Sequence, residues 1–445
     1  MTKITQLPVD PGPAAWNSLL PSVPPRAALE KPATADWIVI GAGFAGLSAA
    51  RRLAELHPAE RIVVLDACRI AEGPSGRNSG FMIDMPHDLS SDDYGGNGEN
   101  DHRQIRLNSA AIDYAMLAKE RWQMSDEAIV ASGKINGAMT ARGVAHNEAY
   151  AKHLQHLNKP LERLDARAMQ EITGTRCYID GLYTPGTVML QPALYTRTLA
   201  EGIESNRVSI YENSPVTSLQ KLPGHWIANT PKSSVNAPKV ILTVNGHLES
   251  FGYYQRHLVH VYTYGTMTSA LTGKEIKALG GQPNWALTPA DPLGTTVRRI
   301  SGTGGDRIII RNRATFDPAL SVNDKRVDRV GRDHDKSFAN RFPMLSGVDM
   351  QYRWGGRLCL SLNSVSVFGE VDNNLFAACC QNGLGTAKGT ISGKLIAELA
   401  SGESSALLDD QLADTGPVKL PPSIIAKVGG SVRLKWGEFR AGKEL

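Results

Sequence analysis

Cysteine is scarce in this sequence, and so are long apolar runs. The chain of 445 residues has five cysteines, an odd number, and no two of them form a CxxC pair. This argues against a disulfide framework and a structural zinc site, so we expect no metal. No stretch approaches the roughly 20 apolar residues of a spanning helix, and the N-terminus lacks the apolar run of a signal peptide. We therefore expect a cytoplasmic protein without a membrane span.

An excess of one charge is also missing. Lys and Arg number 48 against 44 Asp and Glu, which gives a formal net charge of +4, and the charges are dispersed without a basic tract. Nucleic acid is therefore not an expected partner, although a locally positive pocket for an anionic substrate stays open. A chain of this length with 42% hydrophobic residues should form at least two lobes.

The first 35 residues are rich in proline. The prolines stand at positions 8, 11, 13, 21, 24, 25 and 32. Prolines at this density preclude a helix and favour an extended surface arm. We expect Trp16, Leu19 and Leu20 to anchor this arm to the rest of the protein.

The remaining chain alternates helical and strand-like segments, which is typical of a mixed α/β architecture. We expect a surface loop at residues 88–100, which are rich in Ser, Asp, Gly and Asn, and an irregular chain with a basic end after Gly402. No internal repeat is present. The expected helices lie within 105–122, 149–157 and 194–204, and expected short strands at 208–211 and 239–244.

A βαβ unit follows the arm. Trp37–Ile40 and Ile62–Leu65 are short apolar runs of the type found in buried parallel strands. Between them, apolar residues recur at helical spacing until His57-Pro58, where the residue before proline disfavours a helix.

The glycines of this unit indicate a diphosphate site. Gly41-Ala42-Gly43-Phe44-Ala45-Gly46 is a GxGxxG directly after a strand and at the start of a helix. Gly41 permits a tight turn, Gly43 allows close approach of a pyrophosphate, and Gly46 allows close packing of helix and strand. The helix N-terminus then offers N–H groups and a positive dipole end to the diphosphate.

An acidic residue stands where a nucleotide ribose would be bound. Asp66, followed by Ala67, ends the second strand twenty positions after Gly46. Its carboxylate can accept hydrogen bonds from ribose hydroxyls and would repel a 2′-phosphate, so NADP is disfavoured. These features do not distinguish FAD from NAD.

The segment after Asp66 resembles a known family. It continues to Gly73-Pro74-Ser75-Gly76-Arg77-Asn78-Ser79-Gly80, which is similar to a loop of the D-amino acid oxidase superfamily, in the branch of glycine, sarcosine and gamma-glutamylputrescine oxidases. In that branch the loop passes the pyrophosphate and reaches the isoalloxazine ring of FAD. Its glycines would lie against a flat ring, while Ser75, Arg77 and Asn78 would offer donors to phosphate or flavin. Ser79 belongs to the same loop.

Further segments extend the resemblance over most of the chain. Residues 184–194 resemble the entry to the helix that precedes the adenine-side strand, and residues 212–216 resemble that strand, where Val216 would contact adenine. Residues 239–246, which include Asn245 and Gly246, resemble the returning strand of the dinucleotide fold.

The C-terminal third carries a second glycine corner. Trp354-Gly355-Gly356 is followed by an apolar strand and by Gly383-Leu384-Gly385-Thr386 at the start of a helix. In the family this helix faces the flavin pyrimidine edge, where its dipole would stabilise the reduced cofactor.

The resemblance implies an α/β fold with a Rossmann-like FAD-binding domain of the glutathione-reductase-2 type. A second, α+β substrate domain would carry a large antiparallel or mixed sheet. The FAD-binding domain is expected to be discontinuous, at residues 36–90, 175–250 and 355–402, with the substrate domain at 91–174 and 251–354. Residues 1–35 would form the arm and 403–445 a tail.

The resemblance also implies the reaction. The family oxidises a carbon bearing nitrogen by hydride transfer to flavin N5, and the imine is then hydrolysed; the flavin supplies the chemistry. The expected substrate is a primary or secondary amine: an amino acid, an N-alkyl amino acid or a gamma-glutamyl amine. Molecular oxygen or an electron carrier would reoxidise the flavin. Alternatives are a 2-hydroxy acid dehydrogenase of the same superfamily and a flavin-binding partner protein without turnover.

Candidate substrate residues are aromatic and basic. Tyr262 and Tyr264 are expected to wall the pocket, with Trp285 and Trp354 behind them, although each could simply pack in the core. Lys388 lies one residue out of register with a substrate-binding lysine of sarcosine oxidase. An arginine of the alternating region 295–313 could bind a carboxylate: Arg298, Arg299 or Arg311.

We expect the FAD to be non-covalent. A family member links its flavin to a cysteine in the strand that contains Cys359, but the alignment places Leu358 at that position. A shift of one residue in a strand points the side chain to the opposite face.

Overall fold

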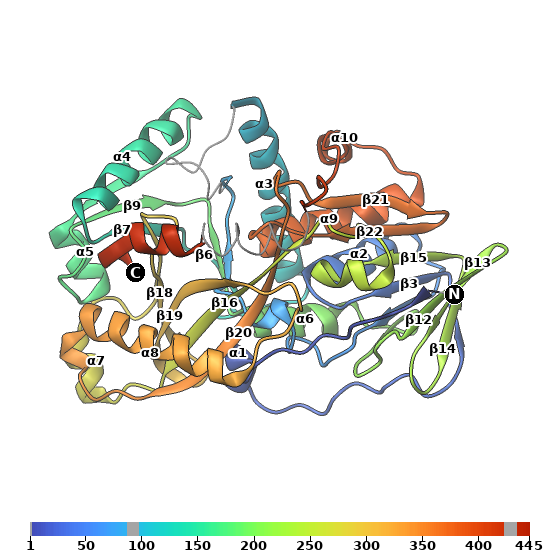
Figure 1. Cartoon of the computed structure of the whole chain (residues 1–445), viewed down its shortest axis with the longest axis horizontal. Coiled ribbons are helices and arrows are strands. Elements are labelled where there is room, and N and C mark those ends of the chain that lie inside the picture. Colours follow the sequence, from blue (N-terminus) through green and yellow to red (C-terminus); the bar gives the residue numbers. More distant parts are fainter. Residues whose placement is uncertain (1, 87–97, 422–433) are drawn as a thin grey trace.

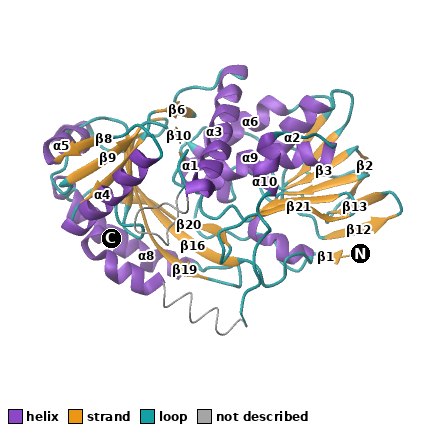
Figure 2. Cartoon of the chain, turned by 90° about the horizontal axis from the view of Figure 1, so that it is seen from above, coloured by secondary structure: helices purple, strands orange, loops and turns teal. Residues whose placement is uncertain are grey.

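The computed structural model describes residues 2–86, 98–421 and 434–445, and the chain folds into two lobes (Figure 1). One lobe is built on a six-stranded sheet and the other on an eight-stranded sheet. The two termini lie in different lobes in both views (Figures 1 and 2). The predicted two-lobed α/β architecture is therefore confirmed, while the exact domain boundaries stay a prediction.

The six-stranded sheet begins with the predicted βαβ unit. Strands β3 (Trp37–Ile40) and β4 (Ile62–Leu65) are buried along their whole length and pair in parallel, and helix α2 (Phe44–Leu56) connects them. The predicted strand at 239–244 is β15 (Lys239–Leu242), which pairs in parallel with the other side of β3. Apolar side chains on both faces of these strands suit a sheet that is covered on both sides.

Three more strands complete this sheet in the order β11-β4-β3-β15-β22-β21. Strand β11 (Val208–Tyr211) pairs with β4, and β22 (Leu375–Cys379) pairs with β15, both in parallel. Strand β21 (Val367–Asp372) is antiparallel to β22 at the edge. Since β3 and β22 run in parallel, the glycine turns that follow them emerge at the same edge of the sheet.

Helices cover one face of this sheet and a second sheet covers the other. The helical face is formed by α2, α3 (Gly98–Arg121), α6 (Pro192–Ile203) and α9 (Gly385–Ser401), whose apolar residues form one core. The opposite core lies under a five-stranded sheet. Its strands, in spatial order, are β1 (Thr2–Lys3), β12 (Ser218–Leu222), β13 (His225–Asn229), β14 (Ser234–Ala237) and β2 (Ala33–Thr34).

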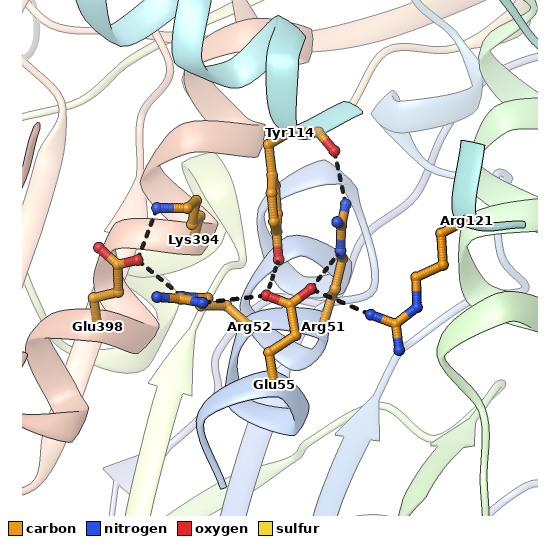
Figure 3. Close-up of polar contacts among 7 residues, drawn as sticks. All are labelled: Arg51, Arg52, Glu55, Tyr114, Arg121, Lys394 and Glu398. Atoms are coloured by element: carbon orange, nitrogen blue, oxygen red, sulfur yellow. Dashed lines mark hydrogen bonds and ion pairs between the residues drawn. The ribbon is translucent and has the colours of Figure 1, made fainter. Parts of the chain in front are cut away.

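An ion-pair network joins three of these helices (Figure 3). Arg52 of α2 contacts Glu398 of α9 at 2.8 Å and Glu55 of its own helix at 3.3 Å. Arg51 pairs with Glu55 at 2.9 Å, and its guanidinium lies 3.7 Å from the ring centroid of Tyr114 in α3. The network holds α2 and α9 side by side, so their N-termini have fixed relative positions.

The second lobe carries the predicted large mixed sheet. All neighbouring strands in it are antiparallel except β17 and β7, which pair in parallel. The spatial order is β20 (Met350–Leu360), β16 (Val259–Thr268), β19 (Gly305–Phe316), β18 (Thr296–Gly302), β17 (Trp285–Pro289), β7 (Lys134–Ala138), β9 (Asp180–Thr184) and β8 (Glu162–Asp165).

Helices and a small sheet complete the second lobe and its junction with the first. Helix α8 (Asp324–Arg341) packs on β16, β19 and β20. The lobe also contains helices α4 (Ala141–His156), α5 (Ala166–Thr173) and α7 (Gly273–Leu279). A three-stranded sheet contains β5 (Phe81–Met82), β10 (Val188–Leu190) and β6 (Ile129–Ala131). Within the described part of the chain, no helix is long and apolar enough to span a bilayer.

Several local predictions need correction. Residues 212–216 do not form a strand, because β11 ends at Tyr211 and the chain then turns towards β12. The chain after Gly402 is not irregular throughout: α10 (Ala406–Leu412) and a helix at 434–441 follow. Most of the predicted loop at 88–100 lies outside the described residues, and its last three residues begin α3.

The N-terminal arm is extended except for one helical turn, α1 (Ala15–Ser18). Trp16 is fully buried, and its indole Nε1 donates to the carbonyl of Asn78 at 2.8 Å. Leu19 and Leu20 are also buried. The arm adds β1 and β2 to the five-stranded sheet and is therefore an integral part of the first lobe.

Trp16→Ala should lower the free energy of unfolding by about 3–5 kcal/mol, because it empties a large buried site and removes the indole donor. Urea denaturation followed by circular dichroism measures this change. Val9→Ala is the control on the same arm, since Val9 is 61% exposed. Equal stability of the two variants would show that the arm is not docked.

Candidate active site

A cavity of about 430 Å³ is lined by residues of both lobes. Its walls include the turn between β3 and α2, the segment after β4, the turn before α9, and parts of β16, β19 and β20. The volume lies within the range of cofactor and small-ligand sites. This cavity is therefore the candidate active site.

The glycine turn after β3 forms one end of the cavity. Gly41 has φ +101°, and a Cβ there would lie 2.7 Å from the carbonyl oxygen of Thr243. A Cβ on Gly46 would lie 1.7 Å from the carbonyl oxygen of Gly41, so only glycine lets α2 begin this close to the strand. Gly43, the N-cap of α2, has no side chain to bond the first-turn amides, which leaves them for an anion.

Asp66 lies at the end of β4 beside this turn. Its Oδ2 accepts a hydrogen bond from the Ala42 amide at 2.7 Å, and its Oδ1 accepts one from the Cys68 amide at 2.8 Å. Burial raises the pKa of Asp66 to about 6, although both amide hydrogen bonds oppose that shift. A ligand hydroxyl that donates to this carboxylate would favour its charged form.

The loop 73–80 passes along the cavity with its main chain. The Arg77 guanidinium donates to the carbonyls of Pro11 and Gly12, each at 3.0 Å, and the Asn78 amide donates to the Ser75 carbonyl at 2.7 Å. These two side chains therefore hold the loop itself, so the prediction that they donate to phosphate or flavin needs correction.

The turn before α9 forms the second glycine corner. Gly383 has φ +88°, and α9 begins at Gly385 without a side-chain cap. The hydroxyl of Thr386 donates to the carbonyl of Phe81 at 2.5 Å, which ties this helix start to β5. Two uncapped helix N-termini, of α2 and α9, thus line one cavity and suit an anionic ligand that reaches both.

The cavity lining includes every predicted cofactor residue except Gly46 and Gly76. Both exceptions are packing positions, since a Cβ on Gly76 would lie 1.8 Å from the carbonyl oxygen of Ala71. The predicted residues that line the cavity are Gly41, Gly43, Phe44, Ala45, Asp66, Ala67, Ser75, Arg77, Asn78, Ser79, Val216, Asn245, Gly246, Gly383, Leu384, Gly385 and Thr386.

Strand β16 points its two tyrosines away from the cavity. The cavity is lined by Val261, Thr263 and Gly265, and alternate residues of a strand face opposite sides. The hydroxyls of Tyr262 and Tyr264 are hydrogen-bonded on the far side, where their rings pack against α8. The prediction that these tyrosines wall the pocket is therefore wrong, because their neighbours one position along β16 face the cavity instead.

Arg299 and Lys388 also lie outside the cavity. The Arg299 guanidinium forms two 3.0 Å contacts with Asp306, and both side chains are nearly inaccessible. Lys388 lies in a separate recess of about 10 Å³ beside α3. The prediction that these two residues contact the substrate is therefore wrong. Arg299 is paired with Asp306, and Lys388 lies on the side of α9 that faces the separate recess.

Arg311 does line the cavity. Strand β19 places it between Gly265 and Thr296 of the neighbouring strands. Burial lowers the pKa of its guanidinium, and no carboxylate among the described residues pairs with it. Trp354 lines the cavity as well, whereas Trp285 belongs to the core behind the sheet.

Sequence reasoning missed two walls of the cavity. One is the arm segment 4–8, held by a buried ion pair in which Asp10 makes two 2.8 Å contacts with Arg357 of β20. The other is formed by Leu434 and Glu438, one helical turn apart in the C-terminal helix. The local sequence of these two segments does not relate them to the cavity. The spacing of residues 434 and 438 indicates only that the two side chains share one face of a helix.

The cysteines are free thiols in the structure. Cys359 is buried, and a hydrogen bond with Cys380, together with burial, raises the pKa of its thiol well above the ordinary value. Cys359 lines the cavity, as does its neighbour Leu358, which pairs with Val261, so the alternation of the strand does not by itself exclude Cys359 from the cavity. The described residues contain no group of three or more His, Cys, Asp or Glu side chains that could hold a metal ion.

Relatives in sequence are bacterial oxidoreductases. The chain is 26% identical over 393 residues to gamma-glutamylputrescine oxidoreductase of Escherichia coli, covering 85% of this chain and 87% of the relative. It is 24% identical over 416 residues to a probable oxidoreductase, OrdL, of Haemophilus influenzae, covering 89% and 88% respectively.

Solved structures share the fold. Glycine oxidase from Geobacillus kaustophilus superposes with a TM-score of 0.67 at 16% identity, over 84% of this chain and 96% of that one. Iminodiacetate oxidase from Chelativorans sp. BNC1 gives a TM-score of 0.66 at 17% identity, over 83% and 96%. The family model for FAD dependent oxidoreductases (DAO) matches residues 36–399. The chain therefore belongs to this family and is an FAD-dependent oxidoreductase.

Proposed function

We propose that this enzyme oxidises a primary or secondary amine that carries a carboxylate: an amino acid, an N-alkyl amino acid or a gamma-glutamyl amine. The carbon next to the neutral nitrogen loses a hydride, and water hydrolyses the resulting protonated imine to a carbonyl compound and the released, protonated amine. Bound FAD supplies the redox chemistry by accepting the hydride at N5. The observation that carries this proposal is Arg311, a cavity-lining guanidinium without a carboxylate partner in the described chain.

The proposed cofactor contacts follow the two glycine corners. The first turn of α2 would hold the pyrophosphate, and Asp66 would accept hydrogen bonds from the adenosine ribose. Val216 would lie against adenine. The main chain of 73–80 and the N-terminus of α9 would contact the flavin half. The raised pKa of the Cys359 thiol supports non-covalent FAD, because a protonated thiol is a poor nucleophile.

Arg311 would orient the substrate and adjust its protonation. A carboxylate bound to its guanidinium gains charge-assisted hydrogen bonds and fixes one end of the substrate. The same positive charge disfavours a nearby ammonium, so it lowers the pKa of the substrate amine and favours the neutral form that can be oxidised. No acid–base side chain is then required for hydride transfer.

The names of two relatives support an amine substrate, since one is a gamma-glutamylputrescine oxidoreductase and one a glycine oxidase. Arg311 would bind the carboxylate of a 2-hydroxy acid equally well, so a 2-hydroxy acid dehydrogenase is the second candidate. Free thiols throughout agree with the proposed cytoplasmic location.

Anaerobic mixing with substrate should bleach the yellow flavin. We expect amines that carry a carboxylate to reduce the flavin, and 2-hydroxy acids of the same chain length to leave it oxidised. Readmission of air then identifies the electron acceptor of the reduced flavin. Peroxide formation would indicate an oxidase, and slow reoxidation an electron carrier. Bleaching by hydroxy acids alone would reject the amine proposal in favour of the second candidate.

Arg311→Met should reduce kcat/KM for amines that carry a carboxylate by roughly 100-fold or more, because the bound carboxylate loses its charged partner. Steady-state kinetics on a matched pair of amines, with and without the carboxylate, measures this loss. Arg329→Met, on the exposed face of α8, is the control. An equal loss for both amines would contradict a role in carboxylate binding.

Binding of FAD to the apoprotein should weaken as the pH falls through about 6. The pKa of Asp66 is raised to that value, so its protonated form predominates below it and accepts ribose hydroxyls less well. Fluorescence titration with FAD between pH 5 and 8 measures the affinity. Asp66→Asn should bind more weakly at pH 8 and lose this step, whereas the exposed Asp113→Asn should retain it. An unchanged step in Asp66→Asn would assign it to another group.

A further inference from the structure

Strand β19 contains a bulge at the substrate end of the cavity. Its residues Asn312 and Ala314 pair with adjacent residues of β16, which leaves Arg313 as the extra residue. Arg313 has φ +59°, in the left-handed region that non-glycine residues rarely adopt. Bulges re-aim a side chain and are common beside active sites, and such strain persists only where surrounding contacts hold it.

Glu438 of the C-terminal helix holds this bulge. Its Oε2 contacts the Arg313 guanidinium at 3.0 Å, and its Oε1 accepts a hydrogen bond from the Ala314 amide at 3.1 Å. Both Glu438 and Arg313 line the cavity. Arg313 also contacts Asp333 of α8 at 3.3 Å, but Asp333 is 40% exposed and lies outside the cavity lining.

The position of Glu438 is fixed by the chain end that follows it (red, beside the C label in Figure 1). The Glu444 carboxylate accepts hydrogen bonds from the Met139 and Thr140 amides, both at 2.9 Å, at the start of α4. The Glu444 carbonyl accepts from the Thr295 amide at 2.8 Å and from the Arg341 guanidinium at 2.7 Å. These contacts tie the segment 434–445 to the sheet beside Arg311.

The charged side chains next to the bulge leave one positive charge in excess. Among the described residues of β19 and the C-terminal helix that line the cavity, the charged side chains are two guanidinium groups, of Arg311 and Arg313, and one carboxylate, of Glu438. Glu438 neutralises Arg313, so a substrate meets one uncompensated positive charge. A unit charge added or removed at this depth alters the binding of an ion strongly, because water screens it poorly.

We propose that Glu438 sets the charge selectivity of the substrate cavity, so that the enzyme favours substrates with one carboxylate over those with two. The inference rests on the proposed function, because Arg311 provides the remaining positive charge. It assigns a specificity-determining residue to a segment outside residues 36–399, which the family model matches.

The test uses propionate and succinate, which differ by one carboxylate, as non-reacting probes of the FAD-loaded enzyme. Their dissociation constants are measured from the perturbation of the flavin absorbance spectrum. Native enzyme should bind propionate more tightly. Glu438→Gln keeps an amide oxygen for the Ala314 N–H but removes the negative charge, so the ratio of the succinate constant to the propionate constant should fall by about tenfold or more.

Three variants serve as controls. Glu438→Asp retains the charge and should keep the preference of the native enzyme, as should the exposed Glu403→Gln. Arg313→Met leaves Glu438 unpaired and should shift the ratio the opposite way, against succinate. This opposite shift keeps the inference testable if Glu438→Gln fails to fold.

An unchanged ratio in Glu438→Gln, with both probes weakened equally, would show that Glu438 only supports the bulge and would overturn this inference alone. Failure of propionate to bind the native enzyme would overturn the carboxylate site of the proposed function, and this inference with it.

Discussion

The architecture depends on how closely α2 and α9 approach each other and the sheet. A Cβ on Gly46 would lie 1.7 Å from the carbonyl oxygen of Gly41, and a Cβ on Gly393 would lie 2.1 Å from the carbonyl oxygen of Ala45. No side chain fits at either place, so the two helices can meet backbone to backbone. Their N-termini, 341 residues apart in sequence from Phe44 to Gly385, therefore open onto one cavity. The ion pair of Arg52 in α2 with Glu398 in α9 then fixes the contact (Figure 3).

The second lobe contributes a wall whose chemistry depends on strand alternation. On β16 the cavity face carries Thr263 and Gly265, small residues that leave room, and the opposite face carries the tyrosines that bind α8. On β19 the same rule presents Arg311 to the cavity, and the bulge at Arg313 adds a second guanidinium. This part of the wall thus combines small side chains of β16 with two guanidinium groups of β19.

Local sequence determined the parts of the site that were predicted well. The GxGxxG turn, Asp66 and the turn at 383–386 each follow a buried apolar strand, so their geometry comes from a few consecutive residues. Tyr262 and Arg299 were misplaced for a different reason. The face of a strand that borders the cavity depends on which lobe packs there, and the partner of Arg299 is a residue across a hairpin. Neither is visible in a single segment, and the same holds for the arm at 4–8 and for Glu438.

The two walls outside the family-matched core have an evolutionary consequence. The arm segment 4–8 and the helix at 434–441 both line the cavity, and both lie outside residues 36–399, which the family model matches. Neither segment contributes a strand to the six-stranded or the eight-stranded sheet, so exchange of either leaves those two sheets in place. Relatives with the same core could therefore diversify in selectivity by replacing their terminal extensions, and grafting such extensions between homologues would be a direct way to redesign this enzyme.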